Sequence, residues 1–342
     1  MIEARYHDSV NVLQEMFAAP GAGIEDPTPF DRAEWYALLA GTDLAPLIVT
    51  ATKANKRAAM ALVHKDRRVT PLRNWYSFVW RPIAPAGAEG DRLLEAIATS
   101  LRTRAHRVTL APVPDENGAA SRLASVFSKA GWRVEVSACD TNHYVRLAGR
   151  DFERYWNERP GALRSTLRRK AHKVSVALHQ AFDTRTWEHY EAVYAASWKP
   201  QEGEPAMLRA FAQQEGAAGR LRLGLATHEG QAVAAQLWTI EAGVAYIHKL
   251  AHFESHRHLS AGTTLSAAMF KSAIDHDRVD CIDFGTGDEP YKRDWMEETR
   301  PRYQIDCLDM KQPRAWVDLA RLAAGRLREA DVPALARLPM GS

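Results

Sequence analysis

The chain has 342 residues, of which 46% are hydrophobic and 25% charged, and its net charge is +3. This balance is that of an ordinary folded protein and excludes a disordered tail, a collagen-like repeat and a coiled coil. The length predicts two domains at about 150 residues each. No apolar stretch approaches the length of about 18 residues that a membrane-spanning helix needs, and no signal peptide is recognisable. Because the three cysteines are widely spaced, we expect no disulfide framework or Cys-based zinc site, and a cytoplasmic protein.

Strand and helix patterns alternate in the first half of the chain. The expected elements are helix 31–40, strands 47–52, 58–63 and 75–80, helix 91–104, strand 108–111, helix 117–130 and strand 133–147. Asp31 is the expected cap of the first helix. The order of these elements indicates a mixed α/β layout.

The second half repeats this order. The expected elements are helices 152–174, 187–198 and 205–214, strands 221–227, 232–240 and 244–253, helix 263–275, strands 281–284 and 303–310, and helix 314–330. Strands 221–253 form an antiparallel meander with turns at Gly230 and Gly243. We therefore predict a tandem duplication joined near Gly149, with a ligand cleft between the halves. The expected divisions are an N-terminal domain 1–148, a C-terminal domain 149–312, and an amphipathic helix and tail 313–342.

The start of the helix near residue 263 is suited to binding an anion. It follows a long strand and reads Arg257-x-x-Ser260-x-Gly262-Thr263-Thr264. Free backbone N–H groups and the positive end of the helix dipole favour an anion at such a start, and Gly262 permits close approach. The alternative interpretation is that Ser260 caps an ordinary helix.

The segment 281–295 combines an apolar strand with a polar, glycine-containing loop. Asp283 lies in the strand, and Lys292 follows beyond the loop. Because a buried carboxylate is costly unless it is paired, Lys292 is the candidate partner of Asp283. Loops at the carboxyl ends of such strands are common ligand sites. The alternative is an ion pair that only holds the loop together.

The region 244–295 resembles the GNAT superfamily of acyl-CoA-dependent N-acyltransferases, in the BioF2-like or CelD-like branch related to the FemAB peptidoglycan transferases. The motifs that carry the resemblance are Arg257-x-x-Ser260-x-Gly262 and Asp283-Phe284-Gly285-x-Gly287-Asp288-x-x-Tyr291-Lys292-x-x-Trp295. The basic helix 164–173, Trp198 and the segment 246–249 support it. The resemblance covers about residues 150–310. It implies tandem GNAT-like domains, each a mixed central sheet flanked by helices.

The resemblance also implies direct attack of an amine on a thioester. This reaction needs a neutral amine, a donor for the developing oxyanion and an acid for the leaving thiolate. Asp283, Glu289 and His248 are the candidate bases, Lys292 would stabilise the oxyanion or a phosphate, and Tyr291 would act as the acid. The expected donor-binding residues are Arg257, Ser260, Gly262, Thr263 and Thr264, and the expected acceptor-binding residues are Trp198, Gln236, Lys249 and Arg168.

Three functions are compatible with these residues. The first is N-acyl transfer from acetyl-CoA or another acyl-CoA to an amine, such as an amino sugar of envelope or exopolysaccharide synthesis. The second is a FemAB-type transferase that uses aminoacyl-tRNA, favoured by the basic helix and by Ser260 where GNAT phosphate loops carry glycine. The third is a non-catalytic regulator that binds a nucleotide or sugar.

Two further patterns favour ordinary structural roles. Four histidines between residues 248 and 258 lie on a strand and loop, so their side chains do not converge, and we expect no metal. Charge runs such as 164–173 are usually solvated helix faces, although an anionic acceptor or tRNA would suit this one. Several aromatic residues, among them Trp75 and Tyr76, are candidates for stacking on a sugar, but core packing is the favoured explanation for each.

Overall fold

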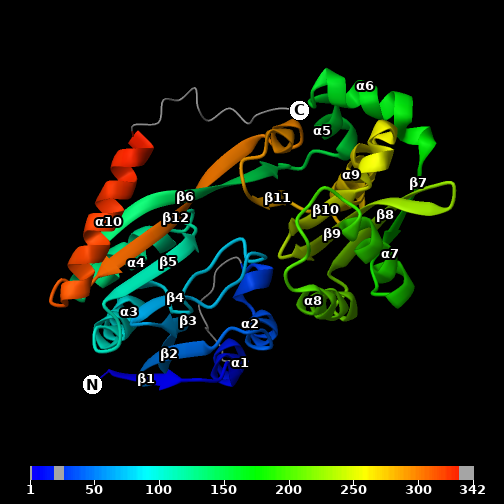
Figure 1. Ribbon diagram of the computed structural model, residues 1–342. Helices are drawn as coiled ribbons and strands as arrows, with labels where there is room; N and C mark the ends of the chain where they lie inside the picture. The colour runs from blue at the N-terminus through cyan, green and yellow to red at the C-terminus, as the bar shows by residue number, and fades with distance from the viewer. Residues whose placement is uncertain (1, 19–26, 331–342) are drawn as a thin grey trace.

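A computed structural model describes residues 2–18 and 27–330 of the chain. Its strands form one twelve-stranded sheet in the order β1-β2-β3-β4-β5-β12-β6-β11-β10-β9-β8-β7, with helices packed around it (Figure 1). The molecule is elongated, with the N-terminal half and α10 on one side and β7–β11 with their helices on the other. In the described part of the chain no helix is long and apolar enough to cross a membrane.

The N-terminal half contains most of the elements that the sequence predicts. They are β1 (Glu3–His7), α1 (Asn11–Ala18), η1 (Pro29–Asp31), α2 (Ala33–Ala40), β2 (Pro46–Lys53), β3 (Lys56–Lys65), β4 (Arg68–Pro71), α3 (Gly87–Leu101), β5 (Arg107–Val113), α4 (Ala119–Lys129) and β6 (Arg133–Arg146). The expected cap Asp31 is wrong: α2 begins later, and Asp31 closes a capping box with Thr28 around η1.

The predicted strand 75–80 is also wrong. This segment is an irregular loop. The Trp80 N–H donates to the Pro112 carbonyl of β5 at 2.8 Å, and just after the segment Ile83 forms a bridge with Ala59 of β3. β4 pairs only with Leu62–Lys65 of β3, and nearer its start the same edge of β3 is bridged by Ile83 rather than by residues 75–80. Tyr76, Phe78 and Trp80 of the loop are buried instead, whereas Trp75 is 53% exposed. The Trp80 indole donates to the carbonyl of Ala61 at 2.9 Å.

The C-terminal half follows the predicted order but contains one additional strand, β7. Its elements are α5 (Phe152–Asn157), α6 (Gly161–Lys170), η2 (Ala171–Lys173), β7 (Ser175–His179), α7 (Thr184–Ala195), α8 (Pro205–Ala217), β8 (Leu221–His228), β9 (Gln231–Glu241), β10 (Val244–His252), η3 (Glu254–Leu259), α9 (Ala261–Lys271), η4 (Ser272–His276), β11 (Cys281–Thr286), η5 (Pro290–Asp294), β12 (Glu298–Leu308) and α10 (Pro313–Ala330). The predicted meander is present as β8-β9-β10. The helix expected over 152–174 is divided at Pro160, because proline cannot continue the hydrogen-bonded ladder.

The two halves exchange their last strands. β6 ends the first half in sequence but pairs with β11, while β12 ends the second half and pairs with β5. β6 and β12 then pair with each other from Glu298–Tyr144 to Leu308–Arg133. On either side of this central pair, the strand pairings repeat the same sequence of senses: three antiparallel, one parallel and one antiparallel. The sheet therefore has the internal symmetry that a duplication produces.

The boundary expected near Gly149 lies in the connection between β6 and α5. The division at residues 148 and 149 remains a proposal, since the sheet runs through both halves. The expected unit 313–342 begins with α10, and its last part, 331–342, lies outside the described residues.

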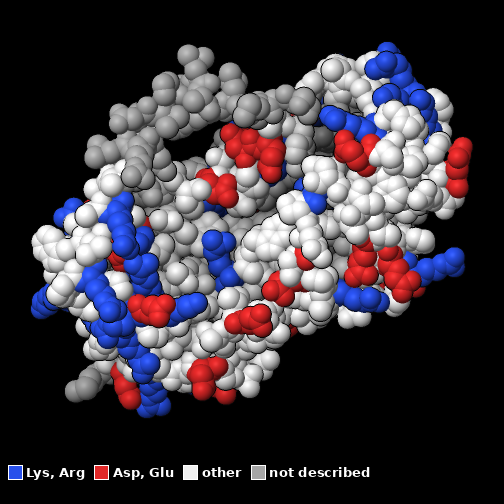
Figure 2. Space-filling view, viewed as in Figure 1, with Lys and Arg blue, Asp and Glu red and all other residues white. Residues whose placement is uncertain are grey.

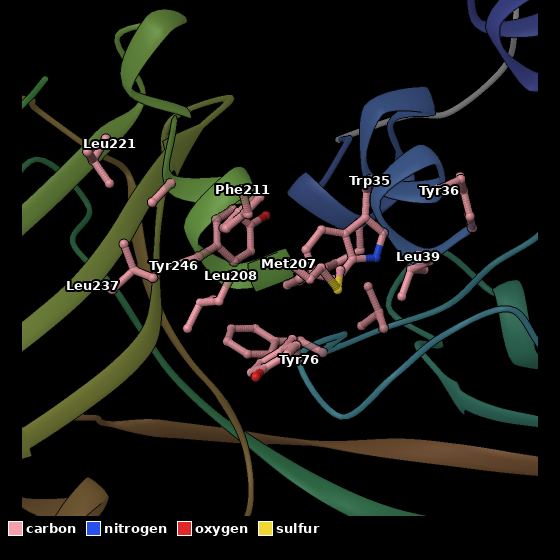
Figure 3. Packing of buried hydrophobic residues seen from close by; sticks show 14 of the residues in the cluster. Trp35, Tyr36, Leu39, Tyr76, Met207, Leu208, Phe211, Leu221, Leu237 and Tyr246 are labelled. Carbon is pink, nitrogen blue, oxygen red and sulfur yellow. The ribbon is translucent and has the colours of Figure 1, made fainter. Parts of the chain in front are cut away.

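One apolar cluster joins the two halves. Trp35 of α2 packs edge-to-face on Phe211 of α8, with ring centroids 5.2 Å apart. Figure 3 shows these rings beside Met207 of α8, with Tyr76 of the N-terminal half below them and Tyr246 of β10 beside Phe211. This burial of large side chains fixes the position of the loop around residue 76 against β10. The two halves are therefore held together by a packed apolar cluster at this junction.

Candidate functional site

The site begins where two parallel strands separate. β10 and β11 are paired from Val244–Cys281 to Tyr246–Asp283. β10 nevertheless continues to His252 and β11 to Thr286, and a bulge interrupts the β9–β10 register at His248. Beyond Tyr246, the edge of β10 that faces β11 has therefore lost its ladder partner. Ligands commonly bind at the carboxyl ends of parallel strands, and here the ends are open.

Two cavities meet at this opening. The first, the α9 cavity, has a volume of about 700 Å³ and is lined by the start of α9, the end of β10 and residues near Trp295. The second, the aromatic cavity, has a volume of about 320 Å³ and lies against the loop around Tyr76. Leu250 of β10, Phe284 of β11 and Tyr291 of η5 line both. The three shared residues define the junction of the two cavities.

The start of α9 faces the α9 cavity without a side-chain cap. Ser260 is in the left-handed conformation, with φ 53° and ψ 37°, and its side chain does not cap the helix. Its Oγ instead accepts a hydrogen bond from Lys170 Nζ on α6 at 3.1 Å. The alternative in which Ser260 caps an ordinary helix is therefore wrong. Gly262 and Thr263 line the cavity, and a Cβ at Gly262 would lie 3.4 Å from His252 Nδ1.

Gln236 positions this helix start. Its side chain is buried, and its Nε2 donates to Ser266 Oγ at 2.7 Å and to the Gly262 carbonyl at 3.4 Å. Its Oε1 accepts from the Trp238 indole at 3.0 Å. Because its donors and acceptor are engaged, Gln236 connects β9 to α9 beneath the α9 cavity that it lines.

The other residues expected to bind ligand lie at different depths. Trp198 lines the α9 cavity and packs against His252, with ring centroids 4.2 Å apart and the rings tilted by 45°. Arg257 lies at the rim, where its side chain is 77% exposed and 3.6 Å from Glu254. Thr264 is buried behind the first turn of α9, and Arg168 is exposed on α6; neither is among the described residues that line the two cavities.

Asp283 is paired, but not with Lys292. Its Oδ1 accepts from Asn142 Nδ2 at 2.6 Å and from the Gly285 N–H at 2.7 Å, and its Oδ2 accepts from Arg300 Nη2 at 2.6 Å. The predicted Asp283–Lys292 pair is therefore wrong. Successive strand residues point to opposite faces of a sheet, so Phe284 faces the cavities while Asp283 faces β6 and β12.

Lys292 instead closes the loop after β11. Its ammonium donates to the carbonyls of Thr286 at 2.5 Å and Gly287 at 3.0 Å, and it pairs with Glu289 Oε2 at 2.9 Å. These three partners use the three donors that a lysine has. The loop needs glycine at position 287, where φ is +97°.

We expect Lys292→Met to lower the free energy of unfolding by about 2–3 kcal/mol, because two loop carbonyls and a carboxylate lose a charged donor. The acyl-transfer activity that the sequence resemblance implies should fall with it, since Glu289 and Tyr291 lose their support. Thermal unfolding and acyl-transfer assays on the same preparation check this, with the exposed Lys311→Met as a matched control. A Lys292→Met protein of unchanged stability and activity would contradict both roles.

Lys249 lies in a ring of aromatic side chains. Its Nζ is 3.0 Å from Glu202 Oε1 and 3.4 Å from the centre of the Trp75 ring. Tyr76 donates to the same Glu202 oxygen at 2.5 Å. Burial lowers the pKa of Lys249 to about 8, although Glu202 favours its charged form. Lys249 thus lines the aromatic cavity as an ammonium that is easily neutralised.

The remaining candidate groups of the aromatic cavity have distinct protonation states. His248 lies among the rings of Phe30, Phe78 and Phe211, and burial lowers its pKa to about 3, so the imidazole is neutral near pH 7. Burial raises the pKa of Tyr291, which therefore stays protonated. Burial opposes ionisation of Glu289, but the hydrogen bond and the charge of Lys292, with smaller contributions from a backbone hydrogen bond and Lys199, together lower the pKa and keep Glu289 a carboxylate.

Several of these residues carried no signal that sequence reasoning used. Leu250 and Phe284 form the junction although both have an ordinary strand pattern. Glu202 and Lys199 lie between two helices, in a segment without a motif. The cluster of aromatic residues 75–80 was the available signal, and of these Trp75, Tyr76 and Phe78 line the aromatic cavity. In the described part of the chain, no three His, Cys, Asp or Glu side chains gather as a metal site.

Comparison with known proteins agrees with this geometry. Residues 157–293, which include both β10 and β11, match the family of acetyltransferase (GNAT) domains. The structure is similar to that of FemX, with a TM-score of 0.61 and 9% identity over 90% of this chain and 98% of that one. The chain has a FemAB-like tandem GNAT fold.

Two further solved structures share this tandem GNAT fold. The first is L-PGS from Bacillus licheniformis, with a TM-score of 0.55 and 11% identity over 89% of this chain and 97% of that one. The second is a tandem GNAT protein from the clavulanic acid biosynthesis pathway, with a TM-score of 0.51 and 12% identity over 89% of this chain and 98% of that one. No curated protein matches the sequence. The tandem GNAT fold is an acyltransferase fold, and the diverging strands β10 and β11 lie in its matched domain.

Proposed function

We propose that the protein is an N-acyltransferase in which the α9 cavity holds an acyl thioester and the aromatic cavity holds the amine acceptor. The observation that carries the proposal is the junction of the two cavities at Leu250, Phe284 and Tyr291. Two separate binding spaces that meet at one point bring two reactants together with their reacting atoms adjacent. We propose acetyl-CoA or another acyl-CoA as the donor.

The α9 cavity suits such a donor along its length. The uncapped start of α9 offers backbone N–H groups to the phosphates, and Lys170 and Arg257 lie nearby as cations. Leu163, Leu250 and Trp295 provide apolar walls for the pantetheine arm. Gly262 has no side chain at the point where the His252 side chain of β10 comes close, so the cavity stays open there.

The junction supplies groups for each step of the transfer. The peptide N–H groups on the open edge of β10 are available to the thioester carbonyl, where negative charge develops. Glu289 is the carboxylate of the aromatic cavity and would take the proton of the acceptor amine, directly or through water. Tyr291 stays protonated at the junction and would donate to the leaving thiolate. Asp283 and Lys292 position the loop that carries these two residues.

The decisive experiment is an acyl-transfer assay. We expect the purified protein to release CoA from acetyl-CoA, or from a longer acyl-CoA, when amines are present, with the acylated amine identified by mass spectrometry. The donor alone should raise the melting temperature. Donor binding without turnover across amino sugars, amino acids and polyamines would favour the non-catalytic regulator. The absence of both binding and turnover would contradict the proposal.

The basic helix favours a second candidate, transfer from aminoacyl-tRNA. Figure 2 shows basic side chains gathered over α6, close to the start of α9. The cations of this segment have no ion pair among the described residues; they are Arg164, Arg168, Arg169, Lys170 and Lys173. A phosphate backbone bound there would reach the α9 cavity. A gel shift with tRNA that weakens steeply with salt, together with no thermal shift by acyl-CoA, would establish this alternative.

The pH dependence of the reaction follows from Lys249. Because its pKa is lowered to about 8, Lys249 is an ammonium below that pH and neutral above it. Above about pH 8, Glu202 therefore lacks its counter-ion, and we expect the kcat/KM for the acceptor to fall. Lys249→Arg retains its charge and moves this fall to higher pH. Identical pH profiles for the wild type and Lys249→Arg would contradict the assignment.

A further inference from the structure

The charges around the aromatic cavity are unevenly matched. Three lysine ammonium groups line it: Lys199, Lys249 and Lys292. Lys249 has its own carboxylate in Glu202, at 3.0 Å. Lys292 has Glu289, at 2.9 Å, and two carbonyl oxygens. The remaining titratable wall residue from β10, His248, is neutral near pH 7.

Lys199 is the lysine without a counter-ion. Its side chain is partly buried, and among the described residues no carboxylate lies within ion-pair distance of its Nζ. Its Nζ lies 5.5 Å from the centre of the Trp198 ring. Burial lowers the pKa of Lys199, with Glu289 and Glu202 opposing and Lys292 reinforcing the shift. A desolvated ammonium in this position is costly unless something anionic approaches it.

The backbone holds Lys199 in place at the wall. The segment leaves α7 at Ala195, and the Lys199 N–H donates to Ser197 Oγ at 3.3 Å. Trp198 packs against His252 on the other side and lines the α9 cavity. Neighbouring residues of one segment thus face the two cavities, and Lys199 faces the aromatic one.

We infer that the aromatic cavity takes a small amine that also carries a carboxylate or phosphate group, and that Lys199 binds this anionic group. The inference rests on the proposed function and deepens it by naming the class of acceptor. A volume of about 320 Å³ is at the lower end of the range for ligand pockets, so the acceptor is small. The aromatic walls of Trp75 and Tyr76 would pack on its carbon skeleton.

The same charges disfavour other amines. A polyamine would bring further positive charge against three lysines that share two carboxylates, and like charges at close range are repelled. A neutral amino sugar would leave the ammonium of Lys199 without a partner. Selectivity for an anionic amine therefore arises from one attractive group and from the repulsion of cationic competitors.

The test compares matched acceptors that differ by the anionic group alone. The pairs are ethanolamine and O-phosphoethanolamine, glucosamine and glucosamine 6-phosphate, and β-alaninamide and β-alanine, assayed by CoA release. We expect the wild type to prefer the anionic member of at least one pair by about 10- to 100-fold in kcat/KM. Phosphate and carboxylate pairs distinguish the two sources of negative charge. Preference for the neutral member in every pair would overturn the inference.

Variants at position 199 separate binding from chemistry. Lys199→Met should raise KM for the preferred anionic acceptor by about 10-fold or more and so remove most of its preference over the neutral member. Lys199→Arg should retain most of the selectivity, and Lys311→Met, distant from the cavity, should behave as the wild type. An equal fall of kcat for both members of a pair would mean that Lys199 acts on the reacting atoms, which overturns the inference.

A binding measurement keeps this result distinct from the proposed function. Calorimetric titration of the wild type and Lys199→Met with O-phosphoethanolamine, glucosamine 6-phosphate and β-alanine needs no acyl donor. Binding that is lost in Lys199→Met supports the anion site even if no CoA is released, in which case the proposed reaction fails alone. Absence of binding of any of these compounds to the wild type overturns the anion site.

Discussion

Gly262→Asp should weaken acyl-CoA binding by more than about 100-fold, because it places a carboxylate where the donor's phosphates would lie. The residue lines the α9 cavity in the first turn of α9, where backbone N–H groups lack a side-chain cap. Its Cβ would also lie 3.4 Å from His252 Nδ1, so the new side chain has to extend into the cavity. Calorimetric titration with acetyl-CoA measures the effect directly.

Gly262→Ala is the control that separates charge from volume. It introduces the same Cβ contact without a charge, and alanine is a good helix former, so the fold should be retained. We expect a loss of affinity of about 10-fold or less. If Gly262→Asp binds acetyl-CoA as the wild type does, the donor phosphates lie elsewhere.

Asp283→Ala should lower the free energy of unfolding by about 3 kcal/mol. The carboxylate is 2% exposed and accepts from Asn142, the Gly285 N–H and Arg300. Its removal leaves the Arg300 guanidinium, which burial already disfavours, without this partner, and Asn142 loses an acceptor. Chemical denaturation measured by circular dichroism reports the change.

A double variant tests whether the pair accounts for this loss. Asp283→Ala with Arg300→Met removes both charges, and we expect it to cost less than the sum of the two single changes. If the effects are additive, Asp283 and Arg300 are independent, and the cost arises from Asn142 and Gly285. Wild-type stability in Asp283→Ala would contradict the structural role altogether.

Sequence patterns alone determined the main outline of the protein. The alternating patterns predicted a tandem α/β protein, and the turns at Gly230 and Gly243 predicted the meander that contains β10. The segment 257–264 and the motif 283–295 indicated the GNAT resemblance, which the match over 157–293 supports. These features succeed because they depend on residues close together in sequence, where periodicity and turn chemistry act locally.

The partners of the site residues were decided by the tertiary structure. Asp283 contacts Asn142, 141 positions earlier in the sequence, and Arg300, 17 positions later. The exchange of β6 and β12 between the halves brings both residues to it. Lys292 is closer to Asp283 in sequence than Asn142 or Arg300 is, but it lies with Phe284 at the aromatic cavity. Asp283 points the other way, because successive strand residues alternate between faces. Likewise, the segment 75–80 has a strand's composition but becomes a cavity wall, because Tyr76 and Phe78 pack in the apolar cluster that joins the two halves. Local patterns encode which element forms, whereas strand order and register decide which side chains meet.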